Sequence, residues 1–345
     1  MVFNLNMSHW YNYLLCVAMI AGGVLLLVKC SDIFVDSASF FAKKLKIPTL
    51  VIGLTVVAFG TSMPELAVSA SDSVACLVNG GNANIAIGNV VGSNICNILL
   101  VLGCSVIISP IILKKDILKF EYPIMLGVSV LAAIFILLFS LNGTYAILRW
   151  EGIILILGII TYVTYLVLKS RKETKPLSKQ DEPQIKDMKT WKAILFLLIG
   201  LGGIVLGGEL VINGAKSVAV GIGDLARLNH DLVESLVGLT IVAVGTSLPE
   251  LVTSVVAAKK GENEIAIGNV IGSNIFNILL ILGVSSVITP LTIGTQIIID
   301  IAVMLLAVVL AFILSIKGKL NKKDGLIFIL CYVAYIAYLI LRTVL

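Results

Sequence analysis

The sequence is poor in charged residues: Asp, Glu, Lys and Arg make up only 13% of its 345 residues, against about 25% in a soluble globular domain. It contains no HExxH motif and no recognisable nucleophile–base pair, which argues against an enzyme. Its six cysteines lie in or beside apolar segments without metal-type spacing, so they are expected to pack as small hydrophobic residues, not as disulfides. The net charge of +5 does not indicate nucleic-acid binding.

Apolar sequence dominates instead. Hydrophobic residues make up 59% of the chain, and they gather in runs of roughly 20, the length of a membrane-spanning helix. We therefore expect an all-α, polytopic membrane protein with ten transmembrane helices. The expected spans lie near residues 11–29, 47–77, 85–109, 120–140, 147–169, 192–215, 231–258, 264–289, 296–316 and 324–343. The first ten residues lack Lys and Arg, and no small-residue cleavage site follows the first run, so no cleavable signal peptide is expected.

Two blocks of sequence occur twice. GLTVVAFGTSMPE, which ends at Glu65, returns as GLTIVAVGTSLPE, which ends at Glu250, with ten of thirteen positions identical. The block IAIGNVVGSNICNILLVLG begins at Ile85, and its counterpart IAIGNVIGSNIFNILLILG begins at Ile265. Matched pairs of this kind indicate an internal repeat, and they suggest one shared site to which both halves contribute.

The repeat divides the chain into two halves of five spans each. We expect a first five-helix repeat over residues 1–169, a linker over 170–191 and a second five-helix repeat over 192–345. Because five is an odd number, the two halves enter the membrane in opposite orientations. This inverted arrangement is typical of secondary transporters, which bind substrate near the midplane at broken helices.

Positive residues gather in alternate loops. Short cytoplasmic loops are rich in Lys and Arg, so both termini are expected outside a cell membrane, with the linker in the cytoplasm. The loops assigned to the cytoplasm contain Lys43, Lys44, Lys46, Lys114, Lys115, Lys119, the 169–192 segment, Lys259, Lys260 and the 317–323 segment.

Each copy of the first block places a glutamate inside an apolar run, where a charge is costly and is a functional candidate by default. On a helix, Thr61 and Ser62 share a face with Glu65. The matching set in the second half is Thr246, Ser247 and Glu250. The proline before each glutamate leaves a main-chain carbonyl without its donor, which is tolerable only where that carbonyl lines a cavity. Such oxygen ligands suit Ca²⁺, Mg²⁺ or Na⁺, not a soft transition metal.

The second block adds further polar side chains. Ser93 and Asn97 lie on one helical face, as do Ser273 and Asn277. Glycines repeat every four residues in the same block and favour close helix approach. The two glutamates give a pooled charge of −2, which one Ca²⁺, two Na⁺ or two protons would neutralise. A site balanced by either set suits exchange better than one-way conduction.

Plainer structural roles are open for several polar residues. Asn97 and Asn277 have an alternative as interhelical hydrogen-bond partners, and the neighbouring asparagines are expected to be structural, not ligating. Those neighbours are Asn89, Asn94, Asn269 and Asn274. A weaker match between the two halves aligns Cys30-Ser31-Asp32 with Gly207-Gly208-Glu209. For Asp32 and Glu209, packing at an interface is favoured over an ion or proton site, and Asp36 is expected to be solvated.

GTSMPE and GTSLPE, followed by GSNICN and GSNIFN, resemble the two α-repeats of the cation/calcium exchanger superfamily, and within it the prokaryotic sodium/calcium exchangers of the YrbG-like branch. The ten-helix inverted plan extends the resemblance over essentially the whole chain. Members use the entry of Na⁺ or H⁺ to expel Ca²⁺ from the cytoplasm. The resemblance implies the same activity here, with no cofactor and no obligate protein partner.

By motif, the resemblance implies a central Ca²⁺ site made by Glu65 and Glu250 with main-chain oxygens of Thr61 and Thr246. Flanking Na⁺ sites would use the Ala58 carbonyl, Ser62 and Ser93, and on the other side the Ala243 carbonyl, Ser247 and Ser273. Asn97 and Asn277 would complete the centre. Some relatives have Asp at one of these two positions, so the Asn pair removes a third carboxylate and argues against K⁺ co-transport.

The expected mechanism is alternating access, in which Ca²⁺ and Na⁺ compete for one centre in separate half-cycles. The first and sixth spans are rich in glycine and are expected to move as gates, partly by analogy with the family. A Ca²⁺/H⁺ antiporter that uses the same glutamates remains the main alternative. A channel or a membrane enzyme fits the duplicated acidic centre less well.

Overall fold

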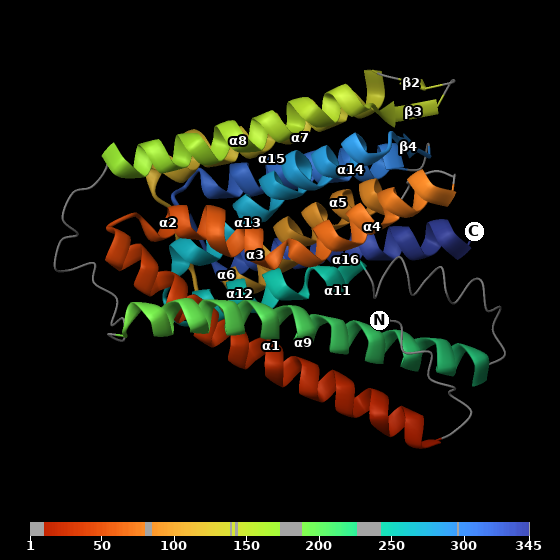
Figure 1. Cartoon of the computed structure of the whole chain (residues 1–345), viewed down its shortest axis with the longest axis horizontal. Coiled ribbons are helices and arrows are strands. Elements are labelled where there is room, and N and C mark those ends of the chain that lie inside the picture. Colours follow the sequence, from red (N-terminus) through yellow and green to blue (C-terminus); the bar gives the residue numbers. More distant parts are fainter. Residues whose placement is uncertain are drawn as a thin grey trace.

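The structure, a computed structural model, describes residues 10–79, 85–138, 140–141, 144–172, 188–225, 243–294 and 297–344. These residues are almost entirely helical, as the long apolar runs predict (Figure 1). The first half contains α1 (Trp10–Leu45), α2 (Thr49–Ile52), η1 (Gly53–Val57), α3 (Ala58–Thr61), α4 (Met63–Asn79), α5 (Ile85–Cys96), η2 (Asn97–Val101), α6 (Leu102–Ile108), η3 (Ile117–Glu121), α7 (Tyr122–Leu138) and α8 (Arg149–Lys172). Segments labelled η are π-helical turns.

The second half follows the same order. It contains α9 (Thr190–Leu225), α11 (Ala243–Thr246), α12 (Leu248–Lys259), α13 (Asn263–Phe276), η5 (Asn277–Leu282), α14 (Gly283–Ile288), α15 (Ile297–Ser315) and α16 (Lys322–Val344). Eight described helices are long and apolar enough to cross a membrane, or nine if the bent pair Thr49–Thr61 and Met63–Asn79 is one span. The expected span at 231–258 lies partly on residues outside the described ranges, so the count of ten stays a prediction.

The first and sixth helices are longer than their apolar runs. We expected spans at 11–29 and 192–215, but α1 and α9 have 36 residues each. The hydrophobic run of α1 stops at Lys29, yet nothing after it breaks a helix until Pro48. The helix ends where Lys46 adopts a left-handed conformation with φ 55°, and the Ile47 N–H closes the end by bonding the Ala42 carbonyl at 3.0 Å.

These two long helices lie against each other along one flank of the bundle (Figure 1). Their backbones approach so closely that a methyl group on Gly23 would lie 2.7 Å from the Gly207 carbonyl oxygen, and one on Gly207 would lie 2.9 Å from that of Gly23. Only glycine fits at such a crossing. The two helices are therefore in direct backbone contact at this crossing.

Short strands tie the two halves together at the ends of the bundle. β1 (Ile111–Ile112) pairs with β5 (Lys319–Leu320), and β3 (Thr144–Ile147) pairs with both β2 (Ser140–Leu141) and β4 (Leu291–Ile293). All of these pairs are antiparallel. Each sheet therefore joins loops that the charge pattern assigns to one side of the membrane. The start of α1 and the end of α16 lie at the same end of the bundle as β2–β4 (Figure 1).

The middle of the bundle is formed where η1 and α3 pack on α13. Gly272 makes this contact possible, because a methyl group in its place would lie 2.6 Å from the Ala58 Cβ and 2.7 Å from the Leu54 carbonyl oxygen. Gly268 likewise faces the Leu50 carbonyl oxygen, which would lie 2.9 Å from a methyl group added at that glycine. The two repeated blocks of sequence, one from each half, therefore meet at the centre of the protein.

Candidate functional site

Both GTSxPE segments interrupt their helices at the same residue. The first half breaks at Ser62, with φ −84° and ψ 6°, between α3 and α4. The second half breaks at Ser247, with φ −88° and ψ 4°, between α11 and α12. In the first half the two helical pieces differ in direction by 46°. The expected break is confirmed, and it places a glutamate in the first turn of the following helix in each half.

Glu65 and Glu250 are both completely buried, with exposed fractions of 0%. They lie near enough for their charges to interact. The Ser62 hydroxyl donates to Glu250 Oε1 at 2.9 Å, and the Ser247 hydroxyl donates to Glu65 Oε1 at 3.5 Å. Each serine therefore contacts the glutamate of the opposite half, and the four residues form one centre.

The second block contributes the other wall of this centre. Ser93 and Asn97 from the first half, and Ser273 and Asn277 from the second, are all buried. Ser93 lies beside the Glu65 carboxylate, and Ser273 beside that of Glu250. Asn97 and Asn277 each begin a π-helical segment, η2 and η5. Such segments occur frequently at functional sites because they redirect side chains out of the regular α-helical order.

Several polar atoms of the centre have no hydrogen-bond partner among the residues that the structure describes. Buried polar groups are nearly always hydrogen-bonded, so a concentration of unpaired atoms in one place points to a ligand. The atoms at the centre are Glu65 Oε2, Glu250 Oε2, Ser93 Oγ, Ser273 Oγ, Asn97 Oδ1 and Nδ2, and Asn277 Oδ1. All of them except the Asn97 amide nitrogen are oxygens, the atoms that a hard cation prefers as ligands.

Two other buried carboxylates in the spans, Asp300 and Glu121, bond side chains of neighbouring helices. Asp300 forms an ion pair with Arg342 at 3.1 Å and accepts a hydrogen bond from the Tyr335 hydroxyl at 3.2 Å. Glu121 accepts one from the Tyr162 hydroxyl at 2.9 Å. No salt bridge to Glu65 or Glu250 is found within the described ranges. The two central glutamates therefore differ from Asp300 in having no cationic side chain beside them in that part of the chain.

The two threonines of the motif contact asparagines from the opposite half. Thr61 Oγ1 donates to Asn269 Oδ1 at 3.0 Å, and Thr246 Oγ1 donates to Asn89 Oδ1 at 3.4 Å. The amide of Asn269 donates in turn to Ser254 Oγ at 2.9 Å and to the Glu250 carbonyl oxygen at 3.4 Å. These two threonine hydroxyls therefore connect the two halves of the protein beside the centre.

Asn89 repeats this bracing in the first half. Its amide nitrogen donates to Ser69 Oγ at 3.0 Å and to the Glu65 carbonyl oxygen at 3.3 Å. The structural role expected for Asn89 and Asn269 is thus found, but it is more specific than sequence reasoning suggested. Ser69 and Ser254 were not singled out, although each stands four residues after a site glutamate and so recurs in register.

The two central amides are not equivalent. Asn277 Nδ2 donates to Asn94 Oδ1 at 3.0 Å, and Asn94 Nδ2 donates to the Asn274 carbonyl oxygen at 3.3 Å. Asn97, in contrast, has neither amide atom paired within the described residues. The alternative role as interhelical hydrogen-bond partner therefore applies to the Asn277 amide nitrogen, and no such bond of Asn97 is found in the described ranges.

Two of the expected ligands are main-chain carbonyl groups, those of Ala58 and Ala243. The Ala58 carbonyl accepts the Ser62 N–H at 3.0 Å, and the Thr61 hydroxyl, which has its shorter contact to Asn269, lies 3.3 Å from the same carbonyl oxygen. Ala243 begins α11, and its side chain is not among those that the structure describes. No cluster of three or more His, Cys, Asp or Glu side chains is found in the described part, so the centre relies on two carboxylates and neutral oxygens.

Comparison with known proteins adds independent findings. A family model described as "Sodium/calcium exchanger protein" matches residues 15–169 and 192–341. The putative antiporter CaxA of Alkalimonas amylolytica is 35% identical over 323 residues, which cover 91% of this chain and 95% of that protein. The inner membrane protein YrbG of Escherichia coli is 36% identical over 283 residues, covering 80% of this chain and 81% of YrbG.

Solved structures of the sodium-calcium exchanger NCX_Mj have the same fold. One, soaked with 2.5 mM Na⁺ and 0.1 mM Ca²⁺, superimposes with a TM-score of 0.75 at 33% sequence identity. The match covers 94% of this chain and 98% of that one. The resemblance inferred from the duplicated motifs is therefore confirmed over nearly the full length.

Proposed function

Because this chain belongs to the sodium/calcium exchanger protein family, we propose that it is an antiporter that expels Ca²⁺ from the cytoplasm in exchange for Na⁺. The family is one of transporters, not enzymes. One observation carries the proposal: Glu65 and Glu250 are buried together at the meeting point of the two halves, each with one oxygen that has no partner among the described residues. Two such carboxylates require cations.

The charge of the centre fits both ions. Two ionised glutamates carry −2, and one Ca²⁺ or two Na⁺ would neutralise them. A cation close to two carboxylates in a low-dielectric interior is held far more strongly than in water, so the site is favourable only when filled by one set or the other. Because the two ions compete for one centre, they cross the membrane in separate half-cycles. The site then opens to one side of the membrane at a time, which is alternating access.

We take the ligands from the family resemblance, and the oxygens of Glu65, Glu250, Ser93, Ser273, Asn97 and Asn277 that have no partner in the described structure support the assignment. Ca²⁺ lies between Glu65 and Glu250, with main-chain oxygens of Thr61 and Thr246. Na⁺ uses the same carboxylates with the serine hydroxyls and alanine carbonyls on either side. These flanking residues are Ser62, Ser93 and Ala58 toward one half, and Ser247, Ser273 and Ala243 toward the other. Asn97 and Asn277 complete the centre as neutral oxygen ligands.

We further propose ten spanning helices in two inverted repeats, with both termini outside the cell membrane and the linker in the cytoplasm. The strand pairs support this arrangement, because β1–β5 and β3–β4 each join loops that the topology puts on the same side. The matching breaks at Ser62 and Ser247 also support it. With one helix break in each repeat, and the repeats in opposite orientations, each repeat contributes half of the site.

The experiment is uptake of radioactive Ca²⁺ by proteoliposomes that contain the purified protein, with Na⁺ inside and none outside. A second set carries only a pH gradient, and Glu250→Gln is the control. Uptake that requires the Na⁺ gradient and is lost in the control supports the proposal. Uptake driven by the pH gradient alone supports Ca²⁺/H⁺ exchange through the same glutamates, while flux indifferent to both gradients is the behaviour of a channel and contradicts antiport.

A further inference from the structure

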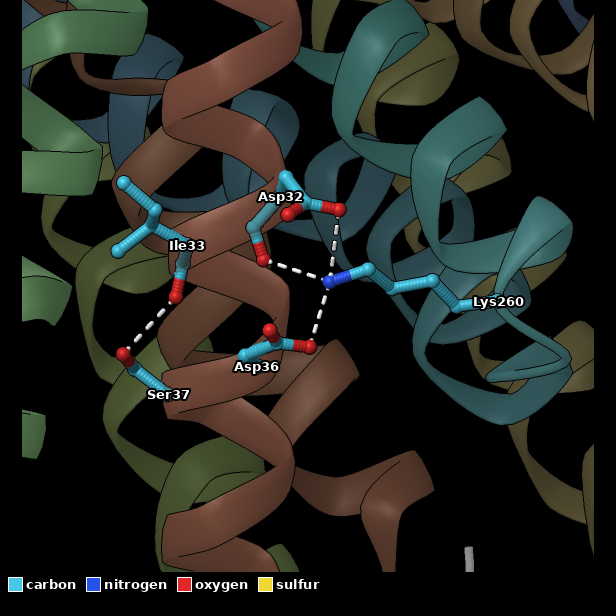
Figure 2. A network of polar contacts seen from close by, with 5 residues as sticks. All are labelled: Asp32, Ile33, Asp36, Ser37 and Lys260. Carbon is cyan, nitrogen blue, oxygen red and sulfur yellow. Dashed lines mark hydrogen bonds and ion pairs between the residues drawn. The ribbon is translucent and has the colours of Figure 1, made fainter. Parts of the chain in front are cut away.

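Lys260 joins two helices far apart in the sequence. Its Nζ lies 2.5 Å from Asp36 Oδ1 and 2.9 Å from Asp32 Oδ1, and it also donates to the Asp32 carbonyl oxygen at 2.8 Å (Figure 2). Asp32 and Asp36 lie one turn apart on α1, so both point toward the ammonium group from the same helix face. We call Asp32, Asp36 and Lys260 the α1 clasp.

The clasp is anchored rigidly on the side of the ion site. Lys260 directly follows α12, the helix that begins just before Glu250. Its N–H bonds the Val256 carbonyl oxygen at 3.0 Å, and Gly261, with φ 80°, turns the chain at once into α13. Lys260 is therefore fixed to the central helices, whereas its two partners belong to α1, one of the pair of long helices on the flank.

A second polar contact strengthens the same interface. The hydroxyls of Ser31 and Thr253 lie 3.2 Å apart, both completely buried between α1 and α12. The clasp lies beside this contact, toward the end of the bundle where α12 ends. By the charge rule that end is cytoplasmic, since Lys259 and Lys260 lie in one of the basic loops. The clasp thus closes α1 onto the centre on the cytoplasmic side.

The inverted repeat provides a comparison, because each gate has a counterpart on the other side of the membrane. Asp32 corresponds to Glu209, and Lys260, ten residues after Glu250, corresponds to Ala75, ten residues after Glu65. Ala75 carries no charge, and within the described residues the Glu209 carboxylate accepts a hydrogen bond only from the Asn213 amide on its own helix, at 3.2 Å. Among those residues, a clasp therefore exists at one end only.

A contact present at one gate and missing from its counterpart favours one of the two states that alternating access interconverts. We propose that the α1 clasp holds the cytoplasmic gate closed, so that the resting protein offers its site preferentially to the outside. This inference rests on the proposed alternating-access function. The three side chains are 23–51% exposed, so the clasp is weak enough to open in each cycle.

The test that does not depend on transport is hydrogen exchange, followed by mass spectrometry, on the purified full-length protein. Lys260→Ala is expected to raise exchange in residues 33–45 about two- to five-fold, the range for partly exposed ion pairs. Lys259→Ala is the matched control, since no ion pair of Lys259 is found in the described part of the chain. The charge-swapped pair Lys260→Asp with Asp36→Lys should restore slow exchange. Equal exchange in Lys260→Ala and Lys259→Ala would overturn the clasp.

Transport assays at both faces of the membrane test whether the clasp keeps the cytoplasmic gate closed. Opening the cytoplasmic gate more often should lower the apparent KM for Ca²⁺ at the cytoplasmic face and raise it at the outer face, each by about two- to five-fold. A variant that is merely unstable would not move the two constants in opposite directions. Asp36→Asn, which leaves Asp32 in place, is the milder variant if Lys260→Ala does not fold, and it should show the same opposite shifts.

The two proposals fail in different ways. If the wild-type protein shows no ion exchange under any gradient, the proposed function is wrong, while the hydrogen-exchange comparison still decides whether Lys260 restrains α1. If exchange of Ca²⁺ is normal but Lys260→Ala changes both constants in the same direction, the antiporter stands and the clasp as a cytoplasmic gate is wrong.

Discussion

The Ser62 hydroxyl donates a 2.9 Å hydrogen bond to Glu250 Oε1, so a side chain of the first half holds the carboxylate of the second. The reciprocal contact, from Ser247 to Glu65, is 3.5 Å long. Each glutamate thereby has one oxygen tied across the interface and another, Oε2, without a partner among the described residues. The tied oxygen restrains the orientation of each carboxylate, and the proposed function assigns the second oxygen to the transported ion.

Replacement of either central glutamate by Gln is expected to lower Na⁺-dependent Ca²⁺ uptake at least about tenfold, because interactions with a charged group are worth about 1.5–3 kcal/mol. The matched control is Glu121→Gln, a buried carboxylate whose contact with the Tyr162 hydroxyl an amide oxygen can still accept. Proteoliposome uptake measures all three variants. Normal uptake in Glu65→Gln or Glu250→Gln would contradict the paired-glutamate site.

The asparagine braces predict an asymmetric effect. Asn269 makes bonds of 2.9 and 3.0 Å to Ser254 and Thr61, whereas the corresponding bonds of Asn89 are 3.0 and 3.4 Å. Removal of a buried hydrogen-bonding partner costs about 1–3 kcal/mol, so Asn269→Ala should raise the apparent KM for Ca²⁺ more than Asn89→Ala. Equal constants for the two variants and the wild type would show that the braces do not position the site.

The duplicated motifs carried most of what the sequence could predict about the site. A carboxylate, hydroxyls and a proline at equal spacing in both halves predict a helix break and a buried carboxylate. The structure has the breaks at Ser62 and Ser247 and the buried carboxylates at Glu65 and Glu250. Spacing within a helix, however, fixes only which residues share a face. It does not say which residue of the other half they meet, so the crossed contacts of Ser62 with Glu250 were not predictable.

The boundaries of α1 show a second limit. The apolar run that predicts the first span ends at Lys29. The helix α1 continues beyond it through the charged residues Asp32, Asp36 and Lys43, which hydropathy does not count as part of a span. Those acidic residues are tolerated because Lys260, 228 and 224 positions away in the sequence, pairs with them. We expect Asp36 to be solvated, and the structure shows its side chain 32% exposed and also paired with Lys260. A partner so distant leaves no local pattern in a single sequence.

Gly272 provides a test of the close approach between the repeated blocks. A methyl group there would collide with the Ala58 Cβ at 2.6 Å and with backbone of η1, so Gly272→Ala should destabilise the protein by about 1–3 kcal/mol and lower transport. Gly127→Ala on α7 is the control, since nothing lies within 4 Å of the added methyl group, and Ala favours a helix by about 1 kcal/mol. Thermal unfolding in detergent measures both, and equal midpoints would contradict the packing.

The Asp300–Arg342 ion pair should matter for stability and not for ion selectivity. Loss of one member of a fully buried pair costs about 3–5 kcal/mol. This pair is part-buried, with side chains 18% and 8% exposed, so Asp300→Asn is expected to lower the unfolding midpoint by less than that cost implies. The protein that remains folded should keep the wild-type apparent KM for Ca²⁺, because neither residue belongs to the centre. A changed KM in Asp300→Asn, measured per folded protein, would show that the pair contributes to the transport pathway.

The two central asparagines should respond differently to the addition of charge. Asn277→Asp removes the donor to Asn94 Oδ1 at 3.0 Å and leaves two oxygen acceptors facing each other, at a cost of about 1–3 kcal/mol. Asn97→Asp breaks no hydrogen bond within the described residues. We therefore expect the unfolding midpoint to fall for Asn277→Asp and to change much less for Asn97→Asp.

Asn97→Asp should also change the balance between the two ions. A third carboxylate attracts a divalent ion twice as strongly as a monovalent ion at the same distance. The apparent KM for Ca²⁺ should fall, and the Na⁺ concentration that halves Ca²⁺ uptake should rise severalfold, as competition curves in proteoliposomes would measure. If Asn97→Asp is as unstable as Asn277→Asp, or if Na⁺ competes as it does in the wild type, the Asn97 amide does not face the transported ions.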